Sequence, residues 1–371
     1  MTRIALHVRA VVFALLAGLP VLLGLAGCDR DSRDSKASGP NPARELVFYS
    51  WEEDLPPSLL TAFTAETGAR VVYRTYRSTE EGVAGIRSGQ VCDVAVIENP
   101  FIPDLAAEGL LAELDHRNIP NLVHLAEDFR ELLFDPGNRY SVTFNWGLTG
   151  LVVRDDLAQG RVTRWADLWD ERFAGRIQVW DLQRTLVGIA LKSLGHSANS
   201  EHPAELEAAL ARLVQLKARA RTSGYAPDLA EQALADGRTA LLYGYSQDLL
   251  RGRERGLQVS FVIPAEGSLQ WTDNFVVPAA SPNKHLAERF IDFMLRPENS
   301  ARIVNEQRYP TANKAATPFI RPEILNDPVL FPPVREMRRA EVLMPLSPEG
   351  QRLHADLWRR YLAAPALSAK P

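Results

Sequence analysis

Strand and helix patterns alternate from residue 46 to residue 97, and this order constrains the possible fold more than any other feature of the sequence. β-rich runs at 46–51, 71–73 and 93–97 are separated by helical patterns at 59–63 and 80–88. Each helical pattern is followed by a glycine, Gly68 or Gly89, where a helix stop is expected. Such alternation is typical of a parallel sheet covered by helices, so the sequence predicts an α/β fold.

The second half of the chain repeats this theme. Further strands are predicted at 150–153, 177–180, 239–243 and 259–263, and helices at 204–218, 284–295 and 351–362. The helix at 204–218 spaces its apolar residues three and four apart, so we expect one face to pack against a sheet. Roughly 340 residues remain after the amino-terminal leader, which is more than one ordinary core supports, and two lobes are therefore expected.

The amino terminus has the features of a bacterial secretion signal. Arg3 and Arg9 precede an apolar run from Ala10 to Gly27. A retained membrane helix and ordinary cleavage after Gly27 are the alternatives. The segment Leu25-Ala26-Gly27-Cys28 resembles the lipobox of bacterial lipoproteins. This resemblance implies that 1–27 is a signal peptide, and that an acylated Cys28 anchors the protein to a membrane outside the cytoplasm, in the periplasm.

Residues 28–44 are rich in Ser, Asp, Arg, Lys, Gly, Pro and Asn, which predicts a flexible tether. Cys92 stands at the start of a strand pattern, and we expect it to pack in the core. If Cys28 is lipidated, Cys92 has no partner for an internal disulfide. Removal of two leader arginines changes the formal net charge from −4 to −6. This acidic excess gives no support to nucleic-acid binding and fits a cationic ligand only weakly.

Motifs for cofactors and catalysis are mostly absent. The chain has neither glycine motif for nucleotide phosphates, and its seven histidines lack the spacing of a metal pair, so no cofactor or metal is expected. The segment 244–248 resembles a nucleophile elbow, but Asp248 replaces the final glycine, and Ser246 or Asp248 more plausibly caps the next helix. The consecutive acids Glu52-Glu53-Asp54 do not face one another as glycoside hydrolysis requires. We therefore expect no enzyme.

A set of short blocks resembles the spermidine/putrescine-binding proteins of bacterial ABC transporters. These blocks run in order through the mature chain: Val47-Phe48-Tyr49-Ser50-Trp51, Leu55-Pro56-Pro57, 63–68, Trp165-Ala166-Asp167-Leu168-Trp169, 190–195, Trp271-Thr272-Asp273, Val276-Val277-Pro278, 293–297 and Tyr309-Pro310-Thr311. Any one block alone would be a weak signal. Together they cover residues from about 46 to 330, which makes the resemblance specific.

The resemblance implies a two-lobe, type II periplasmic-binding-protein fold, with a ligand cleft between the lobes. Lobe 1 is expected to hold 45–146 and 272–317, and lobe 2 to hold 147–271 and 318–368. The chain would cross near 144–147 and 271–273, with a third passage after Ala315. The implied partners are a polyamine, a membrane permease and its ATPase, and the protein is expected to be a monomer.

A polyamine site needs aromatic faces for the methylenes and a carboxylate for each buried ammonium. Trp51 ends the first predicted strand, where ligands of parallel sheets gather, and it matches an aromatic wall of the family site. Trp271 and Asp273 match the family's Trp-x-Asp, in which the ring covers the alkyl chain and the carboxylate pairs with an ammonium. Alternation along a strand places both side chains on one face.

Further candidates are weaker. Tyr243 stands where the family commonly has another tryptophan, and either a site or a core position is possible. Glu98 follows the third predicted strand, where the family often has a serine, and could meet a second ammonium. Glu52 and Asp54 follow Trp51 and could line the rim of the cleft.

The main departure from the family lies at 180–185, where the family carries acids for an internal or distal ammonium. The alignment places Leu182 and Thr185 on these acids, whereas a shift of one residue offers Asp181. Loss of the acids would argue against a triamine and would leave a diamine, or another cationic or zwitterionic solute, open. A secreted hydrolase that uses the acids near Trp51 is a remote alternative.

Overall fold

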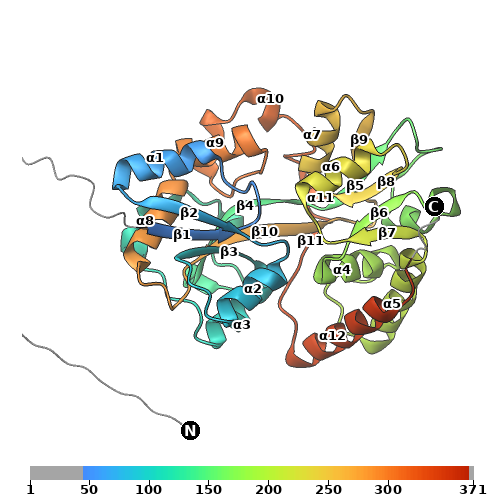
Figure 1. Cartoon of the computed structure of the whole chain (residues 1–371), viewed down its shortest axis with the longest axis horizontal. Coiled ribbons are helices and arrows are strands. Elements are labelled where there is room, and N and C mark those ends of the chain that lie inside the picture. Colours follow the sequence, from blue (N-terminus) through green and yellow to red (C-terminus); the bar gives the residue numbers. More distant parts are fainter. Residues whose placement is uncertain (1–44, 367–371) are drawn as a thin grey trace, which may run out of the picture. The chain divides into compact units, whose positions relative to one another are not determined.

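Two β-sheets, each covered by helices, make up the part of the chain that the structure describes (Figure 1). The computed structural model describes residues 45–366. The predicted signal peptide, the tether and the lipidation site Cys28 lie outside these residues.

The first sheet has the strand order β11-β10-β3-β1-β2, and β4 pairs with β10. Its strands are β1 (Glu45–Ser50), β2 (Arg70–Thr75), β3 (Val94–Glu98), β4 (Ser141–Leu148), β10 (Leu269–Val276) and β11 (Glu341–Val342). The helices of this half are α1 (Pro57–Thr67), α2 (Thr79–Arg87), α3 (Ile102–Ala107), α8 (Lys284–Met294) and α9 (Pro297–Gln307). β1 lies parallel to β2 and β3, while β10 runs antiparallel to β3 and β4.

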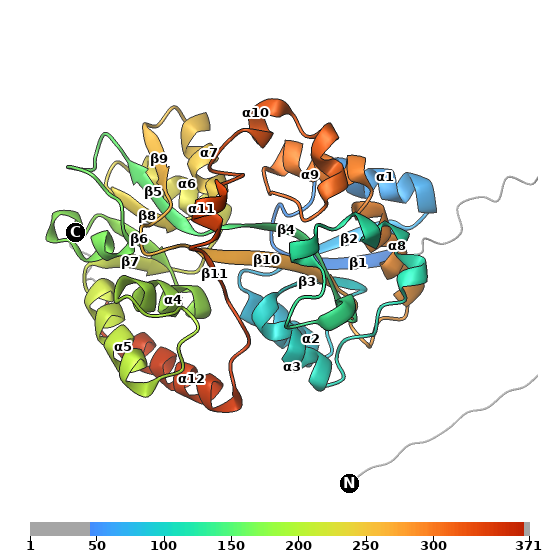
Figure 2. The same cartoon turned by 180° about the vertical axis from the view of Figure 1, so that it is seen from behind.

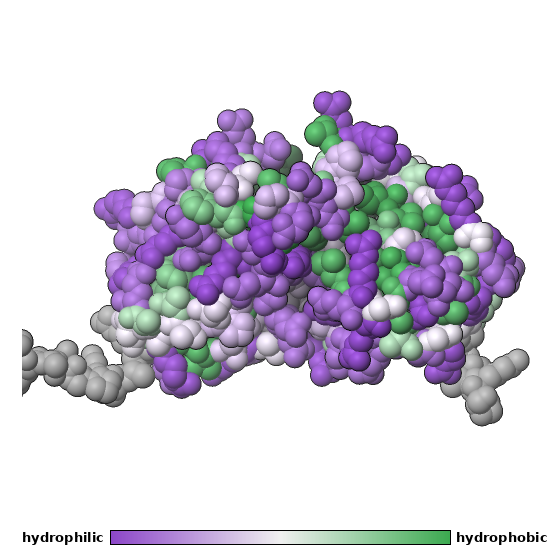
Figure 3. Space-filling model, turned by 90° about the horizontal axis from the view of Figure 1, so that it is seen from above, coloured by the Kyte–Doolittle hydropathy of each residue, from purple (hydrophilic) through white to green (hydrophobic). Residues whose placement is uncertain are grey.

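The second sheet has the strand order β7-β6-β8-β5-β9. Its strands are β5 (Gly150–Arg154), β6 (Ile177–Trp180), β7 (Ala220–Ser223), β8 (Leu241–Gly244) and β9 (Val259–Val262). The helices of this half are α4 (Gln183–Ser193), α5 (Pro203–Lys217), α6 (Pro227–Ala235), α7 (Ser246–Glu254) and α12 (Pro348–Ala363), and the short α10 (Pro322–Leu325) and α11 (Val334–Met337) precede β11. Figure 3 shows hydrophobic residues on the side of this sheet where β5 and β9 lie.

The predicted α/β fold is confirmed, and the helix stops lie where the sequence predicts them. Gly68 ends α1 with a φ of 73°, and its N–H donates to the carbonyl of Thr64 at 2.8 Å. Gly89 follows α2 with a φ of 79°. The sheets are mixed, however, and not wholly parallel. The antiparallel strands include those that carry the chain between the sheets, and alternation of strand and helix does not predict their direction.

The two sheets are joined where β4 passes into β5 and where the chain returns into β10 (Figure 2). A single residue, Thr149, separates β4 from β5. The N–H of Thr149 donates to the carbonyl of Leu269 at 2.9 Å, so the two connections lie side by side. The third passage leads from α10 through α11 to β11 and α12.

Each sheet has its own hydrophobic core, and Cys92 is buried in a third cluster beside β3. Burial raises the pKa of the Cys92 thiol to about 12. Within residues 45–366, no helix is both long enough and apolar enough to cross a membrane.

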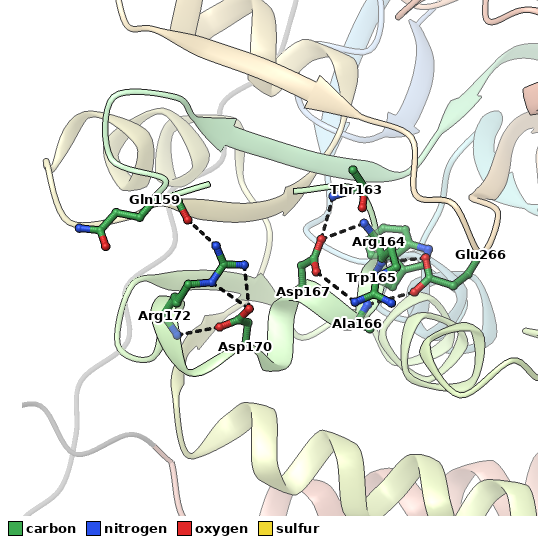
Figure 4. A network of polar contacts seen from close by, with 9 residues as sticks. All are labelled: Gln159, Thr163, Arg164, Trp165, Ala166, Asp167, Asp170, Arg172 and Glu266. Atoms are coloured by element: carbon green, nitrogen blue, oxygen red, sulfur yellow. Dashed lines mark hydrogen bonds and ion pairs between the residues drawn. The ribbon is translucent and has the colours of Figure 1, made fainter. Parts of the chain in front are cut away.

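A polar network anchors the loop that leads into β10 (Figure 4). The carboxylate of Glu266 accepts hydrogen bonds from the N–H groups of Trp165 and Ala166, at 3.0 and 3.1 Å. The indole N–H of Trp165 donates to the carbonyl of Gly267 at 3.0 Å. Asp167 accepts from the N–H of Thr163 at 2.7 Å. These bonds hold the start of the strand that carries Trp271 and Asp273, and they give the 165–169 block a structural role.

Candidate functional site

One pocket is lined by residues from both sheets. Its volume is about 680 Å³, including the space at its mouth. The aromatic residues of its lining are Trp51, Tyr76, Tyr225, Tyr245, Trp271 and Tyr309. The remaining lining residues are Glu52, Asp54, Arg77, Glu98, Ala226, Pro227, Gln247 and Asp273. A pocket of this size, with apolar walls and a few polar groups, suits a small molecule.

The carboxyl ends of parallel strands supply much of the lining. Trp51 follows the last residue of β1, Tyr76 follows β2, and Glu98 is the last residue of β3. In the second sheet, Tyr245 follows the last residue of β8. Ligands of open α/β sheets bind at these ends because the loops that follow the strands diverge there.

The aromatic side chains form two groups. The ring centroids of Trp51 and Tyr76 lie 5.0 Å apart at an interplanar angle of 65°. Trp271 lies between Tyr245 and Tyr309, with centroid distances of 6.1 Å to each and interplanar angles of 89° and 83°. Edge-to-face contacts of this kind fix the rings and leave their other faces available to an alkyl chain or a cation.

Gly147 makes room for the Trp271 ring. The two residues are opposite each other on β4 and β10. A Cβ atom on Gly147 would lie 2.3 Å from Cζ2 of Trp271, which is too close for any real contact. The indole can therefore lie against the backbone of β4 only because residue 147 has no side chain.

We expect Gly147→Ala to displace the Trp271 ring and to weaken ligand binding about tenfold, since forcing a methyl group into a packed site typically costs about 1–3 kcal/mol. Titration calorimetry measures the affinity, and tryptophan fluorescence reports the change around the ring. The matched control is Gly224→Ala, because a Cβ atom on Gly224 would meet no atom within 4 Å. Equal affinities for the two variants would contradict this role of Gly147.

Three buried carboxyl groups lie on the first-sheet side of the pocket. Asp273 on β10 is paired with Glu98 on β3 and with Asn145 on β4. Asn145 also donates to Asp54 at 3.4 Å, and the Ser50 hydroxyl donates to the other oxygen of Asp54. Asp54 and Asp273 are only 1% and 6% exposed.

Burial shifts the titration of these groups. It raises the pKa of Asp54 to about 7, against hydrogen bonds from Ser50 and Asn145 that lower it. Burial, together with the nearby charge of Glu80, raises the pKa of Glu98 to about 7. Burial and the charges of Asp54 and Glu98 raise the pKa of Asp273 well above its usual value, against a hydrogen bond from Trp51. No Lys or Arg contributes to any of these three shifts. The site therefore holds carboxyl groups that lack a cationic partner among the described residues.

The opposite wall, from the second sheet, has no such carboxylate in its lining. Tyr225 and Tyr245 form it, with ring centroids 5.2 Å apart, together with Ala226, Pro227 and Gln247. Behind them, the fully buried Asp248 accepts hydrogen bonds from the N–H of Tyr245 at 2.9 Å and the Tyr225 hydroxyl at 3.2 Å. Asp248 thus caps α7, as one of the two sequence alternatives predicts.

Six of the residues singled out in the sequence lie in the pocket lining: Trp51, Glu52, Asp54, Glu98, Trp271 and Asp273. Tyr243 and Asp181 do not. Tyr243 is fully buried in β8 beneath Tyr245, and their hydroxyl oxygens are 3.3 Å apart. Asp181 accepts a hydrogen bond from the Tyr361 hydroxyl of α12 at 2.9 Å, which directs it away from the pocket.

Leu182 and Thr185 also lie outside the lining, at the start of α4. The sequence prediction missed the aromatic residues Tyr76, Tyr225, Tyr245 and Tyr309, as well as Gln247. The rule applied to Trp51, that ligands gather at strand ends, would have found Tyr76 and Tyr245 if it had been applied to β2 and β8. Tyr309 was visible as part of the block 309–311.

Comparisons with known proteins agree with this geometry. Residues 58–332 match the family model described as bacterial extracellular solute-binding protein. The chain is 31% identical over 330 residues to the spermidine/putrescine-binding periplasmic protein of Escherichia coli, covering 88% of this chain and 91% of that protein. It is 32% identical over 334 residues to the putrescine/cadaverine-binding protein of Pseudomonas aeruginosa, covering 85% and 93%.

Among solved structures, the substrate-binding protein of the spermidine/putrescine ABC transporter from Streptococcus pneumoniae matches with a TM-score of 0.73 and 30% identity. That match covers 86% of this chain and 99% of the solved chain. The family match extends over most of the described residues, and the pocket is lined from both of its sheets. The chain therefore belongs to the bacterial extracellular solute-binding protein family.

Proposed function

We propose that this protein is the solute receptor of an ABC importer, and that it binds a small cationic amine of the polyamine class in the pocket between its two sheets. It releases the solute unchanged to a membrane permease that is driven by an ATPase. It acts in the periplasm as a monomer, anchored to a membrane through a lipid on Cys28.

The observation that carries this proposal is the combination of three buried carboxyl groups without a cationic partner and two tryptophans that flank them. A buried carboxylate without a partner is costly, and a bound ammonium removes that cost. The faces of Trp51 and Trp271 suit the methylene groups and the charge of an aliphatic amine. The names of the relatives point to the same chemical class.

We propose further that 45–146 with 272–317, and 147–271 with 318–368, are two lobes that open and close over the solute. The connections beside Thr149 and Leu269 serve as the hinge. A ligand can drive closure only through contacts that it makes in the closed form, and one that bridges Trp51 and Trp271 would make them.

Two contacts at α7 join the halves beside the pocket. Arg251 of α7 pairs with Glu53 at 2.9 Å, and Gln247 donates to the carbonyl of Arg308 at 2.8 Å. Glu53 and Arg308 both have a left-handed backbone, with φ of 60° and 63°. Such residues are uncommon outside glycine and gather at ligand clamps.

We expect Glu53→Gln to speed solute release by up to about fivefold, because a partly exposed ion pair contributes at most about 1 kcal/mol. Stopped-flow fluorescence measures the dissociation rate. The matched control is Glu231→Gln, which removes the partner of Arg255 within the second half. The latch is disproved if the control speeds release as much as Glu53→Gln does.

Native mass spectrometry of the freshly purified protein tests the proposed function. We expect a bound species with the mass of an aliphatic amine, which is displaced by added putrescine. Titration calorimetry with putrescine and spermidine then gives the affinities. If no amine co-purifies and none binds at millimolar concentration, the protein is a receptor for another solute class.

A further inference from the structure

We infer that the pocket binds a solute with one cationic end, and that it holds the opposite end as an uncharged hydrogen-bonding group. This inference rests on the proposed function and narrows the class of amine that the receptor takes.

All the carboxyl groups in the pocket lining come from the first-sheet side. Asp54 follows β1, Glu98 ends β3 and Asp273 lies on β10. The fourth, Glu52, follows Trp51 and is exposed. Asp273 is the direct strand partner of Glu98, and Asn145 contacts Asp54 while it pairs with Asp273. The three buried groups thus converge at one end of the pocket, where they can surround a single ammonium or guanidinium group.

The opposite end contains no carboxyl group within the described lining. Its side chains are Tyr225, Tyr245 and Gln247, and the N-termini of α6 and α7 face it through Pro227 and Gln247. No side chain caps the start of α6, where the residue before the helix is Ala226. Free N–H groups at a helix N-terminus favour an acceptor and disfavour a cation.

The acids that could have served a second ammonium are already bound elsewhere. Asp248 is fully buried behind the wall, where it accepts from Tyr225 and Tyr245 and has Arg251 at 3.5 Å. Asp181 binds the hydroxyl of Tyr361. Leu182 has no charge to offer.

A second ammonium at this end would therefore lose water without gaining a charged partner, and would lie near Arg251. Desolvation of an unpaired cation is strongly unfavourable. A hydroxyl, amide or other neutral acceptor at the same position could bind the free N–H groups instead. The buried indole N–H of Trp271, which has no partner in the described structure, is a further donor for it.

Matched ligands of equal length test this inference. Titration calorimetry compares putrescine with 4-aminobutan-1-ol, in which a hydroxyl replaces one ammonium. We expect the amino alcohol to bind as tightly as the diamine or more tightly. If putrescine binds more tightly by more than about threefold, the inference is overturned while the amine receptor stands. If neither compound binds, the proposed function itself has failed.

A pair of variants adds a charge test at the opposite end. Asp and Asn both cap helices well, so Ala226→Asp and Ala226→Asn are expected to fold alike and to differ mainly in charge. We expect the preference for putrescine over 4-aminobutan-1-ol to be about tenfold greater in the Asp variant than in the Asn variant, because only Asp supplies the missing carboxylate. Equal preferences in the two variants would show that a charged partner for the second ammonium is not what this end lacks.

Discussion

Asp273→Asn is expected to lower the affinity for a cationic amine at least about tenfold, because it removes one carboxylate from a buried charge pair with the solute. The same change is expected to raise the melting temperature of the unliganded protein. The pKa of Asp273 is raised by its own burial and by the charges of Asp54 and Glu98, so the ionised group is unfavourable when no solute is present. Calorimetric titration and thermal unfolding measure these two opposite effects.

The control for this experiment is Asp128→Asn, which alters an exposed carboxylate away from the pocket. It should leave both the affinity and the melting temperature unchanged. Unaltered affinity in Asp273→Asn would show that the solute does not use this carboxylate. A lower melting temperature in Asp273→Asn would show that the group has a stabilising partner in the unliganded protein.

Solute affinity is expected to fall as the pH is lowered from 8 to 5.5. Asp54 and Glu98 have pKa values of about 7, so they take up protons across this range. A bound ammonium favours their ionised forms and must displace those protons. The affinity should decrease by up to about tenfold per pH unit for each proton displaced. Calorimetry in two buffers of different ionisation enthalpy counts the protons released, and Glu98→Gln should reduce that number.

The stability of the unliganded protein should change in the opposite direction. These carboxyl groups have higher pKa values folded than unfolded, so the folded state binds more protons between about pH 4 and pH 7. Their contribution to stability is therefore present at low pH and is lost as the pH rises through 7. Melting temperatures with and without solute should converge as the pH falls. A constant affinity across this range would mean that the solute does not contact these groups.

The sequence predicts the elements of this fold well because they depend on local patterns. The run 46–51 alternates as a strand needs, and Gly68 stands where α1 must end. The direction of β10 was beyond such a prediction. It depends on pairing between Asp273 and Glu98, which are far apart in the chain, and no local pattern records that register.

The candidate site could be predicted in part, for the same reason. Trp51 was found because it ends a strand, and Trp271 with Asp273 because they resemble a family block. Tyr243 was chosen in place of Tyr245, since the sequence does not show that β8 ends at Gly244 and that only the next residue reaches the pocket. Asp181 was a reasonable candidate until α12 supplied Tyr361, a partner 180 residues away.

The single residue between β4 and β5 limits how the proposed lobes can move. Thr149 is held to Leu269 on the neighbouring connection, and a Cβ atom on Gly150 would meet the Phe261 ring at 2.4 Å, so little backbone is free to bend. Rotation is confined to a few dihedral angles along one line through the molecule. The direction of opening is therefore built into the backbone, and evolution of the pocket can retune the preferred cargo without redesigning the swing of the door.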